Sequence, residues 1–285
     1  MSKHLVTGAS GQLGGHVLAA LEGTLPKSET AVLVRKEEDR ARLAGEGYDV
    51  RVADYSDPAA LTAAFAGIDR LLLISGTEMG QRLPQHKNVI AAAKAAGVGF
   101  IAYTSILAAD RSPMSLAAEH RGTEEELAAS GLAYSVLRNG WYTENITASI
   151  GQDLQLGQHF GAAGTGRFAA APRADYAEAA AAVLTGAGHE GKIYELGGSD
   201  AFTLSDYAAT LSEIAGKPVA YVDMPEAAYA EALTGAGLPG PLADMLSDSD
   251  AKAADGWLYT ESTDLTALIG HPTTPLAEVI KAALG

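Results

Sequence analysis

The sequence predicts an α/β protein, in which a doubly wound parallel sheet is followed by a smaller C-terminal α/β lobe. Apolar runs of strand length alternate with helix-length segments through the first half of the chain, as in βαβ units. Three glycines, Gly8, Gly11 and Gly14, separate the first apolar run from the first amphipathic segment. After Arg138 the alternation becomes irregular, which predicts the second lobe.

Six strands with intervening helices are expected in the first half, and together they make a doubly wound sheet. The expected strands are residues 5–6, 31–34, 48–52, 71–74, 100–103 and 134–137. The expected helices are residues 17–21, 57–65, 83–96 and 115–129. Asp57 before Pro58 is a typical helix start, and Gly97 a typical helix end.

Shorter elements follow in the second half, where residues 157–166 are expected to form a loop or hairpin. Helices are expected over residues 175–184 and 204–214, and strands over residues 192–196 and 219–222. We therefore expect a nucleotide-binding domain over residues 1–150, completed by segments that return from the C-terminal half. Residues 151–285 are expected to form the smaller substrate-side lobe.

Composition excludes several classes of function. The net charge of −15 argues against nucleic acid as a partner. The chain has no cysteine, which rules out disulfides and thiolate sites and fits a reducing cytosol. No apolar run approaches the roughly 18 residues of a membrane span, and Met1–His4 leave no room for a signal peptide before the glycine turn. We expect a cytoplasmic monomer or homodimer without a membrane partner.

The glycine turn at residues 7–15 has the strand–turn–helix setting of a dinucleotide site. Gly8 permits a tight turn, and Gly11 lets the backbone approach a pyrophosphate. Gly14 lets the helix pack closely, so that its N-terminus faces the phosphates. A glycine-rich loop without a ligand is the alternative.

Arg35 indicates which dinucleotide is bound. An acid at the end of the second strand would bond the 2′-hydroxyl of NAD, whereas an arginine there accommodates the 2′-phosphate of NADP. The strand ends in Val34-Arg35-Lys36, with Arg35 close to the expected spacing from the glycines. We expect NADPH as the cofactor, and a solvated surface arginine is the alternative.

Three further features border the expected cofactor path. Asp54 follows the third strand and is placed either to bond the adenine amino group or to begin a turn. Ser75, Gly76 and Thr77 follow the fourth strand, where small residues let a cofactor pass or simply form a tight turn. Lys87 is either a contact of the nicotinamide ribose or a solvated helix lysine.

Many stretches in register resemble the NmrA-like branch of the atypical short-chain dehydrogenases. They cover nearly the whole chain: residues 7–14, 34–35, 72–75, 78–82, 85–90, 93–98, 101–105, 137–145, 173–176, 188–192 and 268–274. Within that branch the resemblance is strongest to the bacterial type 2 NAD(P)H:quinone oxidoreductases.

The resemblance implies a Rossmann domain with a small C-terminal lobe, NADPH in the crevice, and hydride transfer to a quinone without flavin. Carried over by position, the implied cofactor contacts are Gly8, Ala9, Ser10, Gly11, Gln12, Leu13, Arg35, Ser75, Gly76, Thr77, Asn139, Gly140, Trp141, Tyr142 and Arg173, and Lys87 is kept as a candidate. The seven histidines are scattered without paired ligand spacing, so we expect no metal.

The chain departs from most short-chain dehydrogenases on the helix after the fifth strand. Their Tyr-x-x-x-Lys pair is absent: His120 stands at the tyrosine position and Glu124 at the lysine position. Quinone reductases of this branch share the loss. A hydride acceptor that needs little help from a protein acid is therefore expected.

The segment Asn139-Gly140-Trp141-Tyr142 supplies the candidate acceptor site. Asn139 can donate an amide hydrogen bond to a carbonyl oxygen as charge develops, and Gly140 lets a ligand approach. Trp141 and Tyr142 offer flat faces to a flat ring, or else pack between the lobes. His120 is either a proton donor or a structural N–H donor, and we rank it after Asn139.

Two other functions remain open at this stage. An NADPH-dependent reductase of another electron-poor aromatic, such as a triphenylmethane dye, would use the same turn and the same Asn139 segment. A non-catalytic NADP-sensing regulator of the NmrA type would tolerate the loss of the Tyr–Lys pair. The polar and aromatic acceptor segment weighs against a pure sensor.

Overall fold

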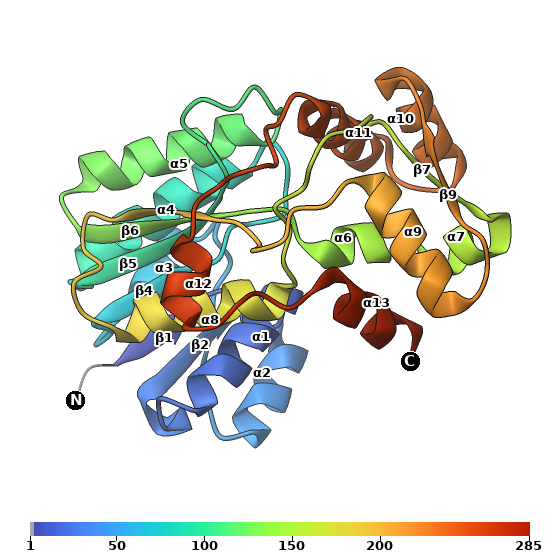
Figure 1. Cartoon of the computed structure of the whole chain (residues 1–285). Helices are drawn as coiled ribbons and strands as arrows, with labels where there is room; N and C mark the ends of the chain where they lie inside the picture. Colours follow the sequence, from blue (N-terminus) through green and yellow to red (C-terminus); the bar gives the residue numbers. More distant parts are fainter. Residues whose placement is uncertain (1–2) are drawn as a thin grey trace. The chain divides into compact units, whose positions relative to one another are not determined.

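The main sheet has seven strands in the order β3-β2-β1-β4-β5-β6-β8 (Figure 1). The computed structural model describes residues 3–285, so that Met1 and Ser2, which the signal-peptide argument includes, lie outside it. The strands are β1 (His4–Val6), β2 (Thr30–Val34), β3 (Asp49–Val52), β4 (Arg70–Leu73), β5 (Phe100–Ile106), β6 (Ala133–Asn139) and β8 (Ile193–Leu196). The β1–β2, β1–β4, β2–β3 and β4–β5 pairs are parallel.

The strand order reverses between β1 and β4, which is the topological switch point of a doubly wound sheet. The predicted fold class is confirmed. All six strands expected in the first half are present, and the strand expected over residues 192–196 joins the same sheet as β8.

Contacts divide the chain into two units. The first contains the residues up to Ser105, then Glu119–Arg138 and Arg173–Tyr194; the second contains Ile106–Ala118, Asn139–Pro172 and Glu195–Gly285. Residues 173–194 thus cluster with the N-terminal segments rather than with their neighbours in the sequence. Residues 106–118 and 139–150 cluster with the second unit, and the expected domain boundary at residue 150 stays a prediction.

The first unit has helices on both sides of its strands (Figure 1). They are α1 (Gln12–Glu22), α2 (Glu37–Gly45), α3 (Pro58–Ala64), α4 (Arg82–Ala96), most of α5 (Ala117–Ser130) and α8 (Arg173–Thr185), with a 3₁₀ turn at Lys27–Glu29. Helix α1 packs on α8, and α3 packs on α4. The sequence interpretation lacks α2, whose first turn carries three acids that favour a helix N-terminus.

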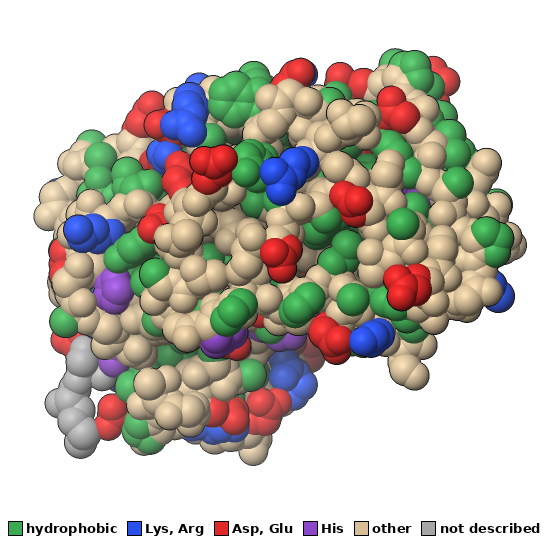
Figure 2. Space-filling view, viewed as in Figure 1, with side chains coloured by type: hydrophobic (Ala, Val, Ile, Leu, Met, Phe, Trp, Pro, Cys, Tyr) green, Lys and Arg blue, Asp and Glu red, His purple; other side chains and the backbone are tan. Residues whose placement is uncertain are grey.

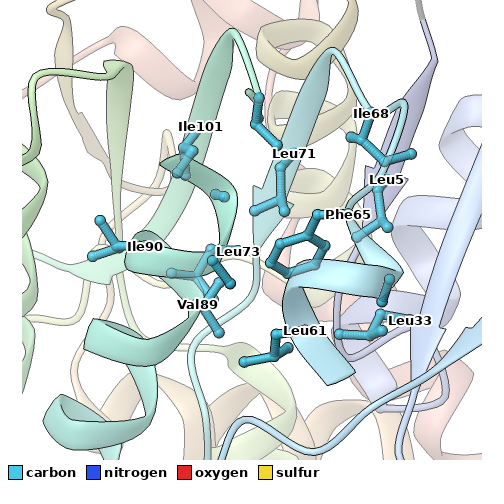
Figure 3. Close-up of a cluster of buried hydrophobic side chains, with 14 of the residues drawn as sticks. Leu5, Leu33, Leu61, Phe65, Ile68, Leu71, Leu73, Val89, Ile90 and Ile101 are labelled. Atoms are coloured by element: carbon cyan, nitrogen blue, oxygen red, sulfur yellow. The ribbon is translucent and has the colours of Figure 1, made fainter. Parts of the chain in front are cut away.

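One core of the first unit lies between the sheet and helices α3 and α4. Side chains of β1, β4 and β5 point toward those of the two helices, and all of them are buried (Figure 3): Leu5, Leu71, Leu73, Ile101, Leu61, Val89 and Ile90. Each such side chain contributes about 1.5–3 kcal/mol relative to its exposed state. This packing fixes the carboxyl ends of β1 and β4, where the glycine turn and Ser75 begin.

The second unit is mainly helical. Its helices are α6 (Thr143–Thr147), α7 (Ile150–Leu156), α9 (Leu204–Ala215), α10 (Glu226–Gly235), α11 (Gly240–Ala254), α12 (Asp264–Ile269) and α13 (Leu276–Leu284). Strand β7 (Gln158–Gly161) pairs in parallel with β9 (Ala220–Asp223), so that the glycine-rich segment at 157–166 contains a strand rather than a hairpin. Its core includes Phe168, Tyr207, Leu211 and Ile280.

No helix within residues 3–285 is long and apolar enough to cross a membrane. On the face shown in Figure 2, Asp and Glu side chains are dispersed rather than gathered in one patch.

Candidate functional site

The glycine turn connects β1 to α1 in the first unit. Gly8 has a φ of +59°, a left-handed conformation that side chains disfavour. The N–H of Gly11 donates to the carbonyl oxygen of Gly8 over 3.0 Å and closes the turn. A Cβ added at Gly14 would overlap this same carbonyl oxygen and lie 2.8 Å from Cα of Ala9. Gly8 and Gly14 therefore let the first turn of α1 lie directly against the loop.

The N-terminus of α1 is open to a ligand. No side chain among residues 3–285 caps it, and no acidic residue lies in its first turn. Side chains cap α3, through Asp57, and α9, through Thr203, whereas α2 and α4 resemble α1 in having no such cap. Gly8, Ser10, Gly11 and Gln12 are exposed, whereas Ala9 and Leu13 are buried. Uncapped backbone N–H groups at the positive end of a helix dipole fit a pyrophosphate.

Arg35 immediately follows β2 and is exposed. Its Nη1 lies 2.6 Å from Oε1 of Glu78 in an ion pair. Asp54 accepts hydrogen bonds from the hydroxyl and backbone N–H of Ser56, and these bonds lower its pKa, with a smaller contribution from the charge of Arg35. The local bonds of Asp54 favour its alternative as a turn residue.

Gly76 is held from both sides by side chains of α4. Its N–H donates to Nε2 of His86 over 3.0 Å, and its carbonyl oxygen accepts from Nε of Arg82 over 2.7 Å. The neighbouring N–H of Ser75 donates to the hydroxyl of Thr104, while Thr77 is exposed. The loop expected to line the cofactor path thus has a fixed backbone.

His86 is fully buried and neutral. Burial lowers its pKa to about 3, and the nearby charge of Arg82 acts in the same direction. Because Nε2 accepts from Gly76, Nδ1 carries the proton and donates to the hydroxyl of Thr123 over 3.0 Å. Thr123 in turn donates to the carbonyl oxygen of Glu119. The sequence interpretation missed this role, although Arg82 and His86 share one helix face at i,i+4 spacing.

His120, which stands at the tyrosine position of other short-chain dehydrogenases, is also buried. Its Nδ1 lies 2.7 Å from the hydroxyl of Tyr103. Burial lowers the pKa of His120 well below its usual value and raises that of Tyr103. This geometry favours the structural alternative for His120 over proton donation near neutral pH.

Other candidates of the first unit are also placed. Glu124, at the former lysine position, binds Arg138 through two hydrogen bonds and accepts one from Ser105. Lys87 is exposed and lies 3.4 Å from Glu126, which favours the solvated-helix alternative. Arg173 is half-buried at the first turn of α8.

The acceptor segment lies in the second unit and has a fixed backbone. The carbonyl oxygen of Asn139 accepts from Leu107, and the N–H of Gly140 donates to Leu196 over 2.7 Å. Tyr142 forms a parallel bridge with Ala171. These bonds hold the positions that would meet a ligand.

Asn139 is buried and its amide is only partly bonded. Its Nδ2 donates to the hydroxyl of Tyr142 over 3.2 Å, whereas its Oδ1 has no hydrogen-bond partner within residues 3–285. A buried polar atom left without a partner costs about 1–3 kcal/mol, which a ligand donor would recover. Trp141 packs against the core of the second unit, which favours its packing alternative.

Within residues 3–285, no three His, Cys, Asp or Glu side chains converge as metal ligands would.

Comparisons with known proteins agree with these features. A family model described as NAD(P)H-binding matches residues 8–187. The chain is 55% identical to quinone oxidoreductase 2 of Escherichia coli K12 over 275 residues, which is 96% of either protein.

Solved structures give the same result. The crystal structure of an Escherichia coli NADPH-dependent quinone oxidoreductase complexed with NADPH superposes with a TM-score of 0.97 at 54% identity, over 99% of this chain and 100% of that one. A triphenylmethane reductase from a Citrobacter species, complexed with NADP(H), gives a TM-score of 0.95 at 37% identity, over 99% and 100% of the two chains. The resemblance seen in the sequence is confirmed, and the chain belongs to the NAD(P)H-binding family, within its NmrA-like branch of atypical short-chain dehydrogenases.

Proposed function

We propose that the protein is an NADPH-dependent quinone oxidoreductase that transfers a hydride to a quinone without flavin or metal. The observation that carries this proposal is the 55% identity to quinone oxidoreductase 2 over 96% of both chains. The uncapped glycine turn and the loss of the Tyr–Lys pair are consistent with it.

The residues of the first unit fit NADPH. The open N-terminus of α1 would hold the pyrophosphate, and Arg35 the 2′-phosphate. The loop of Ser75, Gly76 and Thr77, which His86 and Arg82 fix, would line the path between them. Arg173 and the less favoured Lys87 complete the proposed cofactor contacts.

Bound NADPH supplies the hydride, and the protein's own task is to orient the acceptor and exclude competing reactions. A quinone that gains a hydride becomes a hydroquinone anion. Because the negative charge of this anion is delocalised, its oxygen can take up one proton without the help of a strong acid. Since His120 is buried and neutral, we assign that proton to solvent. Holding the quinone in the right orientation beside the nicotinamide can lower much of the activation barrier, within an upper range of about 7–11 kcal/mol.

Asn139 is the proposed principal contact of the acceptor, with Tyr142 beside it. The buried amide offers an N–H donor toward a developing oxyanion and a free Oδ1 toward a ligand donor. Gly140 leaves room for the ligand, and Trp141 contributes through packing.

The direct test is oxidation of NADPH by a simple benzoquinone with the purified protein and no added flavin. We expect loss of reduced-nicotinamide absorbance in step with hydroquinone formation, and faster turnover with NADPH than with NADH. Turnover of a triphenylmethane dye but not of quinones would make the protein a dye reductase. NADPH binding without turnover of either acceptor would favour the sensing regulator.

The cytoplasmic location and the monomeric or homodimeric state stay predictions. Gel filtration with light scattering tests the second of these.

A further inference from the structure

Glu78 is held by two donors beside the proposed cofactor path. Its Oε1 lies 2.6 Å from Nη1 of Arg35, and its Oε2 accepts from Nε2 of Gln85 over 2.8 Å. Glu78 directly follows the loop of Ser75, Gly76 and Thr77. Gln85 belongs to α4, so the carboxylate is tied to a helix as well as to the arginine.

The surroundings of Arg35 are acidic. Besides Glu78 in direct contact, the carboxylate of Asp54 is close enough to feel the charge of Arg35. Lys36, the adjacent cation, is paired with Glu38 at 3.3 Å. The guanidinium proposed to bind a phosphate is therefore already neutralised by the protein itself.

We propose that Glu78 is a specificity-determining residue that competes with the 2′-phosphate of NADPH for Arg35 and thereby limits the preference for NADPH over NADH. The inference rests on the role of Arg35 in the proposed function. A phosphate binds a guanidinium best through two parallel hydrogen bonds. To form them, it must displace the carboxylate from Nη1 or stay near a like charge, and Gln85 opposes the displacement.

Glu78 could instead assist phosphate binding, and that role has a different measurable consequence. If Glu78 served to align Arg35 for the phosphate, then its neutralisation would weaken binding of 2′-phosphorylated ligands. Competition predicts tighter binding after the same change. The sign of one measured difference separates the two roles.

The experiment compares Glu78→Gln with wild type by calorimetry, using adenosine 2′,5′-bisphosphate and 5′-AMP as probes. The glutamine keeps the size of the side chain and removes its charge. We expect the variant to bind the bisphosphate about two- to fivefold more tightly, the factor that corresponds to an exposed ion pair. Affinity for 5′-AMP, which lacks the 2′-phosphate, should stay unchanged.

Two controls complete the design. Glu38→Gln removes the same charge from the carboxylate paired with Lys36, and should change bisphosphate affinity less than Glu78→Gln. In an Arg35→Ala background, Glu78→Gln should lose its effect. Unchanged or weaker bisphosphate binding by Glu78→Gln overturns the proposal, as does an equal gain in the Arg35→Ala background. Neither probe contains nicotinamide or quinone, so a failure of quinone reduction would be seen separately.

Discussion

The backbone N–H of Gly76 donates a hydrogen bond to Nε2 of the buried His86, 3.0 Å away. This bond joins the loop after β4 to helix α4. We expect His86→Leu to leave that N–H without an acceptor, lower the free energy of unfolding by about 1–3 kcal/mol, and raise the dissociation constant of NADPH. His86→Gln, whose side-chain oxygen can take the place of Nε2, should retain most of the affinity. Denaturant unfolding and NADPH titration of both variants test this, and equal affinities for the two would argue against a positioning role.

The lowered pKa of His86 makes stability depend on pH. Its pKa is about 6.5 when unfolded and about 3 when folded. Above pH 6.5 His86 is neutral in both the folded and the unfolded state, and its contribution to the free energy of unfolding is fully present. Between pH 6.5 and 3 only the unfolded state takes up the proton. The free energy of unfolding therefore decreases as the pH is lowered, by about 1.4 kcal/mol per pH unit.

His86→Gln should therefore lose stability less steeply than wild type as the pH is lowered from 6.5 to 4. The difference between the two denaturation series isolates His86, because His120, which acts in the same direction, is present in both. Parallel curves would contradict the buried neutral state of His86.

The strands of the sheet could be predicted because their pattern is local. The continuous apolar run at Leu71–Leu73 indicates a strand buried on both faces whatever it pairs with. The pairing of β7 with β9 could not be predicted, since it joins segments far apart in the sequence. For the same reason the local sequence of residues 157–166 predicts a loop.

The candidate site shows the same limit. Gly8, Gly14 and Arg35 stand at motif positions and could be identified from spacing alone. The bonds from His86 to Gly76 and from Glu78 to Arg35 depend on where α4 and the loop after β4 lie in space. Composition and periodicity carry no information about such contacts.

Asn139→Ala should lower kcat with a quinone while leaving NADPH binding nearly intact. The expected loss is on the order of tenfold or more, below the roughly hundred- to thousandfold effect of an oxyanion-hole donor, because the hydroquinone charge is delocalised. His120→Asn should lower kcat less. Steady-state kinetics and NADPH titration separate the two effects; unchanged kcat in the Asn139 variant removes this residue from the mechanism, and a larger loss in the His120 variant reverses our ranking.

Arg35→Ala should discriminate between the two cofactors. Removing the guanidinium costs about 1.5–3 kcal/mol of NADPH binding, the scale of hydrogen bonds to a charged group. Competition from Glu78 favours the lower end of this range. NADH, which has a hydroxyl at the 2′ position, should bind as in wild type. Dissociation constants of both cofactors measured by fluorescence test the role, which equal weakening would exclude.

The paired glycines of α1 provide the sharpest test of the turn. A Cβ at Gly14 would overlap the carbonyl oxygen of Gly8, whereas a Cβ at Gly15 meets no atom within 4 Å. Gly14→Ala should therefore push α1 away from the loop, destabilise the protein by about 1–3 kcal/mol, and weaken NADPH binding, since the N–H groups of the first turn would move from the pyrophosphate.

Gly15→Ala is the matched control, because it adds the same methyl group one position along the helix. There it should stabilise the protein by about 0.5–1 kcal/mol, since alanine loses less conformational freedom in a helix than glycine does. NADPH affinity should stay at the wild-type value. If α1 contacts the loop through Gly14, thermal unfolding gives stability changes of opposite sign for the two variants, and cofactor titration shows weaker NADPH binding for Gly14→Ala but not for Gly15→Ala. Equal changes in stability and NADPH affinity for the two variants would show that helical propensity, rather than the close approach of Gly14 to the loop, determines the effect of alanine at both positions.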